Sequence, residues 1–202
     1  MKVFKFGGAS IKSAIAIKNV AKILNSQDLS NCLLVISAMG KMTNAFEKIT
    51  DAYFNNDQEK LTESIDFTSN FHLKIINNLF VENHVIHQKT TVLFEQLTGF
   101  LTQNKSRNYD YLYDQIVSYG ELLSTTIVSD YLNEIKIYNN LKKFYKKSIF
   151  IKFAKFNTPI STNDVINSNN CFISVCKTKL NNRIVIISAI DNSINRSIRG
   201  LS

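Results

Sequence analysis

A lysine followed by two glycines near the amino end is the first set of residues whose types and spacing could do chemistry. Lys5 closes a short apolar-rich run, and Gly7, Gly8 and Ser10 follow it. Glycines let a backbone approach a ligand closely, a helix start directs N–H groups at an anion, and a lysine adds a charge that could reach a phosphate. Two interpretations fit these residues, a phosphate-binding loop and a plain turn. The residues do not form a Walker loop, which requires G-x-x-x-x-G-K-[ST].

Two further segments combine glycine with polar side chains. Residues 37–44 (SAMGKMTN) follow a continuous apolar run, and residues 118–125 (SYGELLST) place a glycine inside a helical pattern. A broken local rule of that kind often marks a functional site. The alternatives are an ordinary strand-to-helix turn capped by Thr43 and, at Glu121, a solvated helix residue. The residues alone leave both alternatives open.

The elements around these segments predict an α/β fold. Apolar runs at 3–6 and 33–36 predict strands, and helical spacing predicts helices over about 11–25, with Ser10 as N-cap, and over about 43–54. This strand–helix–strand–helix order favours a parallel sheet with a right-handed connection. Ligands of such sheets bind beyond the carboxyl ends of the strands, so the first two segments should face one crevice.

The middle of the chain predicts a helical insert. Helical patterns cover about 58–81, 91–103 and 109–132, the last interrupted at Gly120. Within the first of these helices a stripe is predicted to face the core, formed by Leu61, Ile65, Phe67, Phe71, Ile75 and Leu79. Strand signals return at 148–153 and at 184–189, and a polar tail follows.

Composition excludes several classes of protein. The 202 residues carry 24 Lys and Arg against 16 Asp and Glu, but the lysines are scattered, so no nucleic-acid partner is expected. Three cysteines without C-x-x-C spacing predict neither a disulfide framework nor a zinc site, and His84-x-x-His87 lacks a third ligand, so no metal site is expected.

No apolar run approaches the roughly 18 residues that span a membrane, and no signal peptide is seen. A cytoplasmic protein is expected.

Taken together, three ordered motifs resemble the aspartokinase family of the amino-acid kinase superfamily. Residues 3–10 (VFKFGGAS) resemble its K-F-G-G signature, residues 35–44 (VISAMGKMTN) its second loop, and residues 119–124 (YGELLS) its G-E-x-x-S helix. The resemblance is clear to about residue 135. Beyond it, residues 186–190 lack the expected glycine, and residues 198–202 (IRGLS) are a degenerate form of the next motif.

The resemblance implies a fold and an activity. The fold is an α/β/α sandwich with a mainly parallel sheet and a helical insert. Residues 1–202 would form one partial catalytic domain, the N-terminal substrate-binding lobe, without the C-terminal nucleotide lobe or an ACT domain. The activity is ATP-dependent phosphorylation of the side-chain carboxylate of L-aspartate to 4-phospho-L-aspartate, toward lysine, threonine and methionine. Mg²⁺ would accompany the ATP.

Site roles follow from the same resemblance. Lys5 would be catalytic, stabilising charge on the transferring phosphoryl group. The residues implied to bind nucleotide phosphate are Lys5, Phe6, Gly7, Gly8, Ser10 and Ser37. The residues implied to bind the substrate are Thr43, Glu121, Arg199 and Ser202. The alternative is a catalytically inactive lobe that binds aspartate or a partner subunit without ATP turnover, and a homo-oligomer or a complementing chain is expected to cover its exposed sheet edge.

Overall fold

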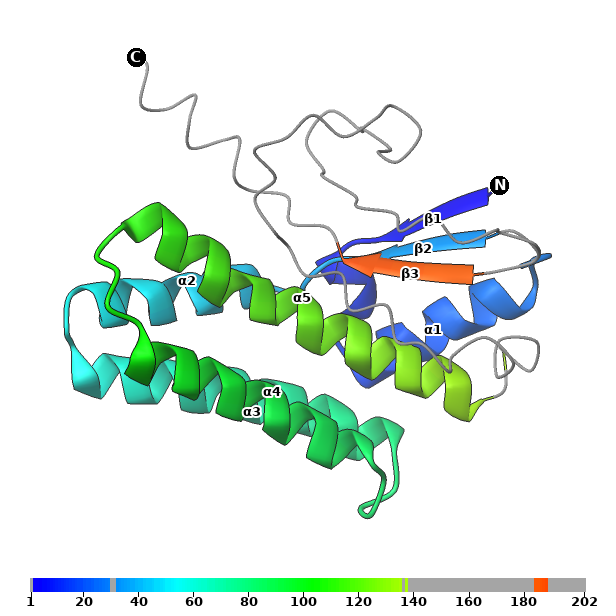
Figure 1. Cartoon of the computed structure of the whole chain (residues 1–202). Coiled ribbons are helices and arrows are strands. Elements are labelled where there is room, and N and C mark those ends of the chain that lie inside the picture. Colours follow the sequence, from blue (N-terminus) through cyan, green and yellow to red (C-terminus); the bar gives the residue numbers. More distant parts are fainter. Residues whose placement is uncertain (1, 30–31, 136, 138–183, 189–202) are drawn as a thin grey trace.

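The computed structural model describes a small parallel sheet and a long set of helices (Figure 1). It describes residues 2–29, 32–135, 137 and 184–188. The strands are β1 (Lys2–Phe6), β2 (Cys32–Ile36) and β3 (Ile184–Ser188), and a 3-10 helix, η1, spans Gly8–Ile11. The α-helices are α1 (Ala14–Asn25), α2 (Met42–Phe54), α3 (Gln58–Leu79), α4 (Ile86–Gln103) and α5 (Tyr109–Glu134).

The sheet has the order β1-β2-β3, and both strand pairs are parallel. Phe6 lies opposite Ile36, and Ile36 opposite Ser188, so all three strands end at one edge. Figure 1 shows α1 and α5 below this sheet. The parallel strand–helix–strand–helix start is therefore confirmed, while the complete α/β/α sandwich and the missing lobe stay predictions. The expected strand at 148–153 lies outside the described residues.

The starts of α1 and α2 differ from the sequence prediction. Ser10 does not cap α1, because the 3-10 turn intervenes and the amide of Ser10 bonds to the carbonyl of Gly7 at 2.9 Å. Ser13 is the N-cap instead, and its hydroxyl accepts the amide N–H of Ala16 at 3.2 Å. Thr43 likewise does not cap α2, since that helix already begins at Met42.

One member of the predicted core stripe on α3 is wrong. The side chain of Phe67 is 60% exposed, whereas Leu61 and Ile75 are buried. A repeat of four residues overshoots the 3.6-residue turn by about 40° at each step, so a stripe spaced by fours winds around the helix. The inward positions near Phe67 are taken by Thr68 and His72, which are both fully buried.

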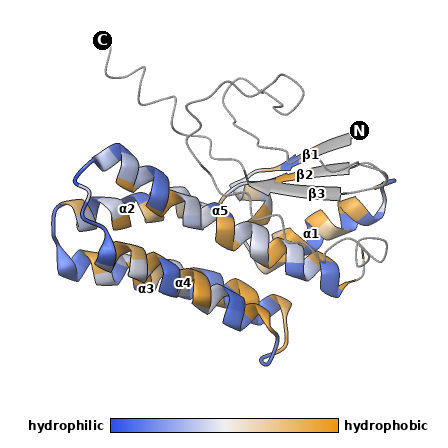
Figure 2. Ribbon diagram, viewed as in Figure 1, coloured by the Kyte–Doolittle hydropathy of each residue, from blue (hydrophilic) through white to orange (hydrophobic). Residues whose placement is uncertain are grey.

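The helices α2 to α5 pack together as a bundle with a continuous apolar core. Large side chains without exposed surface include Phe46, Ile49, Leu97 and Leu112. Figure 2 shows polar residues on the outer surfaces of these helices. Among the helices that the structure describes, none is long and apolar enough to cross a membrane.

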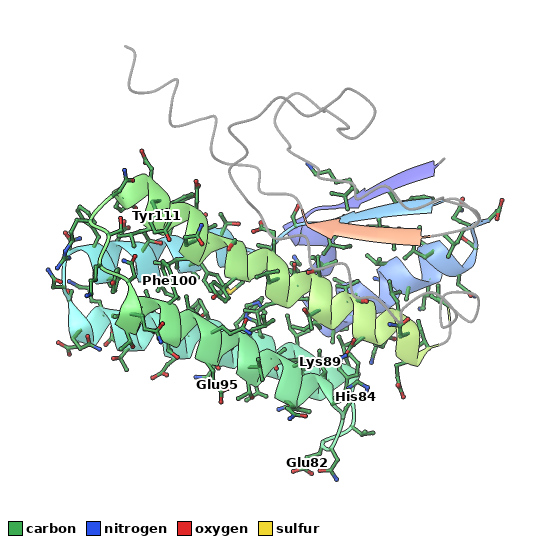
Figure 3. The ribbon with its side chains drawn as sticks, viewed as in Figure 1. Glu82, His84, Lys89, Glu95, Phe100 and Tyr111 are labelled. Atoms are coloured by element: carbon green, nitrogen blue, oxygen red, sulfur yellow. The ribbon has the colours of Figure 1, made fainter. Side chains whose placement is uncertain are left out.

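Two helices run further than their sequence patterns indicate. The fourth helix begins at Ile86, although polar residues there made the sequence pattern predict a start at about residue 91. The buried Thr90 hydroxyl donates to the Ile86 carbonyl at 3.0 Å. The fifth helix passes through Gly120 without interruption. The two helices are joined by an ion pair of 2.7 Å between the Nζ of Lys89, labelled in Figure 3, and a carboxylate oxygen of Asp130.

Candidate active site

Two loops meet at the edge where β1 and β2 end. The first loop follows Phe6, and the second follows Ile36. The amide of Gly40 donates to the carbonyl of Gly8 at 2.9 Å, and the amide of Ser37 donates to the carbonyl of Phe6 at 3.3 Å. The predicted juxtaposition of the first two motifs therefore occurs in the fold, and backbone hydrogen bonds hold it.

The three glycines of these loops are used differently. A Cβ on Gly8 would lie 2.6 Å from the carbonyl oxygens of both Ala38 and Gly40, so the two loops approach too closely for any side chain. Gly40 has a φ of +55°, a left-handed conformation that side chains other than hydrogen disfavour. Among the described residues, a Cβ on Gly7 would meet nothing within 4 Å. Packing therefore requires Gly8, the backbone requires Gly40, and Gly7 faces open space.

The middle of α5 completes the site. A Cβ on Gly120 would lie 3.3 Å from both the Cβ of Ala38 and a ring carbon of Phe46, so the glycine lets α5 approach the second loop. The hydroxyl of Ser124 donates to the carbonyl of Ser37 at 2.7 Å. Gly120 was singled out as a break in the helical pattern. The helix itself continues through Gly120, so this close approach explains why a glycine stands there.

Glu121 enters the interior at this point. It is only 3% exposed, so of the two alternatives left open for Glu121, the solvated helix residue is wrong. Burial in a protein interior strengthens the attraction of a carboxylate for a cation. On the neighbouring residue, burial raises the pKa of the Tyr119 phenol above its usual value. A buried carboxylate beside the second loop is suited to an ammonium group.

The other predicted residues occupy both the rim and the interior of this edge. Lys5 and Ser10 are exposed, Phe6 is buried, and Ser37 and Thr43 are half-buried. All of them belong to the two loops or to the elements directly beside them. Arg199 and Ser202 lie outside the described residues, and their substrate roles stay predictions.

Two side chains beside Gly40 were not expected from the sequence. A Cβ built on Gly40 would lie 3.5 Å from the Cβ of Lys12 and 3.6 Å from the ring tip of Phe71. Lys12 is exposed and brings a second cation to the loops. Neither residue belongs to a motif, because Lys12 stands in a turn and Phe71 comes from the distant α3, so only the fold could place them here.

The described part of the chain holds no cluster of metal ligands, and one cavity in it lies away from the site. Within that part, no group of three or more His, Cys, Asp or Glu side chains is placed to hold a metal ion. A cavity of about 330 Å³ lies between α1 and α5, lined by residues such as Lys18, Lys22 and Tyr131. Tyr131 is about 15 Å along α5 from Glu121 at the usual rise per residue, so this cavity is separate from the site.

Comparison with known proteins shows which proteins this chain is similar to over part of its length. The chain is 37% identical over 139 residues to aspartokinase 2, chloroplastic, of Arabidopsis thaliana, which is 66% of this chain and 24% of that protein. Across about two thirds of its length, this chain is homologous to aspartokinases. Aspartokinase 1, chloroplastic, of the same plant is 34% identical over 67% of this chain and 24% of its own length. The chain spans about a quarter of the length of these curated relatives.

Solved structures agree with this homology. Escherichia coli aspartokinase III in complex with lysine and aspartate has a TM-score of 0.58 and 29% identity, over 67% of this chain and 29% of the aspartokinase chain. The same values hold for that enzyme in complex with aspartate and ADP. A family model described as the semialdehyde dehydrogenase dimerisation domain matches residues 120–192, which begin within α5 and lie mostly outside the described residues. That match covers less than half of the chain.

Proposed function

We propose that this chain carries the substrate side of an aspartate kinase catalytic domain. The reaction transfers the γ-phosphoryl group of ATP to the side-chain carboxylate of L-aspartate and gives 4-phospho-L-aspartate, the first intermediate toward lysine, threonine and methionine. The observation that carries the proposal is the meeting of the two glycine loops and the Gly120–Ser124 segment of α5 at one edge of the sheet. These are the three segments that the aspartokinase resemblance selects.

The first loop suits the transferring phosphoryl group. A carboxylate oxygen of aspartate forms a bond to the γ-phosphorus while the bond from phosphorus to the β,γ-bridging oxygen breaks, and ADP leaves with that electron pair. The protein need only position the reactants and offset their negative charge. Lys5 is exposed at the end of β1, and no side chain of the described residues lies in front of the backbone at Gly7, so both are placed to reach phosphate oxygens. Ser10 and Ser37 add hydroxyl groups to the same edge.

The second loop and α5 suit the amino acid. The buried carboxylate of Glu121 would hold the substrate ammonium, and Thr43, in the first turn of α2, would contribute a hydroxyl. Arg199 and Ser202 are proposed to bind the substrate carboxylate, for which a guanidinium fork is well suited. Aspartate in the two E. coli aspartokinase III structures supports this choice of substrate.

Mg²⁺ is proposed to arrive with the nucleotide. Magnesium is usually bound through phosphate oxygens and a few carboxylates and keeps several waters. In the described part of the chain no cluster of ligands competes for it. When bound, it would offset charge on the phosphates, while the roles of Lys5 and Gly7 remain as stated above.

A second candidate function is supported by the departure from the family motifs after about residue 135. Residues 186–190 lack the glycine of the family pattern and residues 198–202 (IRGLS) are a degenerate form of the next motif, so the alternative is an aspartate-binding unit without ATP turnover. Such a lobe would work with a second copy or a complementing chain. The two candidates share the aspartate site and differ in nucleotide binding.

Isothermal titration separates these candidates. The chain is titrated with a non-hydrolysable ATP analogue and Mg²⁺, then with L-aspartate, beside Lys5→Ala, Glu121→Gln and the control Lys74→Ala on the outer face of α3. The kinase proposal predicts that both ligands bind, that Lys5→Ala weakens the nucleotide and that Glu121→Gln weakens aspartate. Aspartate binding alone supports the inactive lobe. Binding of neither ligand refutes both proposals.

A further inference from the structure

We propose that Phe71, in the middle of α3, is a positioning residue that holds the Gly40 loop against Gly8 and keeps the proposed site assembled. Helix α3 belongs to the helical insert and contributes no residue to the three site motifs. The inference uses the proposed function for one of its two measurements, ligand affinity. The other measurement needs no ligand.

The contact between Phe71 and the second loop is the first observation. The ring tip of Phe71 is 3.6 Å from the place of a Cβ on Gly40, and Lys12 lies 3.5 Å from that place. Phe71 is half-buried, while Phe67, one turn earlier on the same helix, is 60% exposed. The two phenylalanines therefore differ in environment, and the ring of Phe71 is the one that lies beside the loop.

The loop needs such a contact because of its own backbone. Gly40 adopts a φ of +55° and has no side chain with which to anchor itself in the core. Its amide makes the 2.9 Å hydrogen bond to Gly8 that joins the two loops. Glycine loses much conformational freedom when it is fixed, so contacts on its two faces are what offset that loss. Removing the ring would leave a space beside the residue that carries the loop-to-loop bond.

A second line of contact leads from α3 to the other side of the site. The ring of His72 stands edge-on to Phe71, with centroids 5.3 Å apart, and lies 6.4 Å from the ring of Phe46. Phe46 is also the side chain whose ring carbon would lie 3.3 Å from a Cβ on Gly120. Adjacent residues of α3 thus support the Gly40 loop and, through Phe46, the segment of α5 that carries Glu121.

The helical insert therefore has a role beyond completing the core. It sets the distance between the loop that follows β2 and the helix that presents the buried carboxylate. If the ring of Phe71 is lost, the loop can move while the helices remain folded, because the apolar core of α2 to α5 is built from other side chains. The first property to change should be protection of the Gly40 amide.

Amide hydrogen exchange of the full chain under native conditions is the decisive measurement. Phe71→Ala is compared with Phe67→Ala, which makes the same chemical change on the same helix at an exposed position. We expect Gly40 amide exchange to be at least tenfold faster in Phe71→Ala, with the amides of α4 unchanged, and no change in Phe67→Ala. Phe71→Leu, which refills part of the space, should restore most of the protection, and it serves as the test if the alanine variant does not fold.

Affinity for L-aspartate is the second measurement. Phe71→Ala should weaken aspartate binding about tenfold, with Phe71→Leu in between and Phe67→Ala unchanged. Equal Gly40 exchange in Phe71→Ala and Phe67→Ala would overturn the proposal, and so would a uniform rise in exchange over all helices. If the natural chain binds no aspartate, the proposed function fails, while the exchange comparison still decides the role of Phe71.

Discussion

His72 makes the stability of this fold depend on pH. The imidazole is fully buried on α3 and its Nδ1–H donates to the carbonyl of Thr68 at 2.7 Å. Its Nε2 has no hydrogen-bond partner among the described residues. Three phenylalanine rings surround it, those of Phe46, Phe71 and Phe94. Burial lowers the pKa of His72 from 6.5 to about 4, and the hydrogen bond to Thr68 opposes this only in part.

The sign of the effect follows from where the proton binds. Between about pH 6.5 and pH 4 the unfolded chain holds a proton on His72 and the folded chain does not, so acid favours unfolding. The contribution is fully present above pH 6.5 and is lost as the pH falls toward 4. Each whole pH step corresponds to about 1.4 kcal/mol, so the complete loss is about 3 kcal/mol, of which about 2 kcal/mol falls between pH 7.5 and pH 5.0.

Urea denaturation at those two pH values tests this reasoning. The natural chain is compared with His72→Leu, which fills a similar volume without a titrating group. We expect the free energy of unfolding of the variant to fall by about 2 kcal/mol less than that of the natural chain between pH 7.5 and pH 5.0. Equal falls in the two proteins would refute the argument, because other titrating groups contribute to both.

Three further predictions concern the loops and the α4–α5 contact. Gly8→Ala should lower the free energy of unfolding by about 1–3 kcal/mol in urea denaturation, because its Cβ would overlap two carbonyl oxygens. Gly7→Ala should keep or slightly raise stability. The same Gly7 variant should weaken nucleotide binding in a titration. Ser124→Ala should cost about 1 kcal/mol by thermal melting, since it removes the bond from α5 to the second loop; an unchanged melting temperature would contradict this. Asp130→Asn should cost less than about 1 kcal/mol, and the difference should shrink in high salt, because Lys89 is partly exposed.

The parallel start of the fold could be predicted because its signals are local. Short apolar runs, each followed by a loop that contains glycine, indicated β1 and β2. The order of elements indicated parallel pairing and the edge where ligands bind. The starts of α1 and α2 could not be predicted with the same certainty. A 3-10 turn moved the cap from Ser10 to Ser13. The N-cap of α2 is Lys41, which makes no side-chain cap bond and lies two residues before Thr43. Sequence patterns do not fix a helix start to within one or two residues.

The parts of the site that escaped prediction depend on contacts between distant segments. The sequence pattern places Phe71 in a core stripe with Phe67, yet the ring of Phe71 lies beside Gly40 and Phe67 is exposed. A repeat of apolar residues shows only that a helix has an inner face, and it does not show which neighbour that face meets. The break at Gly120 was noticed, but its cause, the approach of α5 to the second loop, belongs to the tertiary structure.

The two halves of the proposed site rest on different physical requirements, and this makes the two candidate functions separable. The aspartate side depends on close packing, because Gly120 and Ser124 bring the buried Glu121 against the second loop. The phosphate side depends on open space in front of Gly7 and on the exposed Lys5. A chain that kept the packed side and lost nucleotide binding would still fold and hold aspartate. Variants at Gly7 and Lys5 should therefore change nucleotide binding with little change in stability, whereas variants at Gly120 or Ser124 should change stability and aspartate binding together.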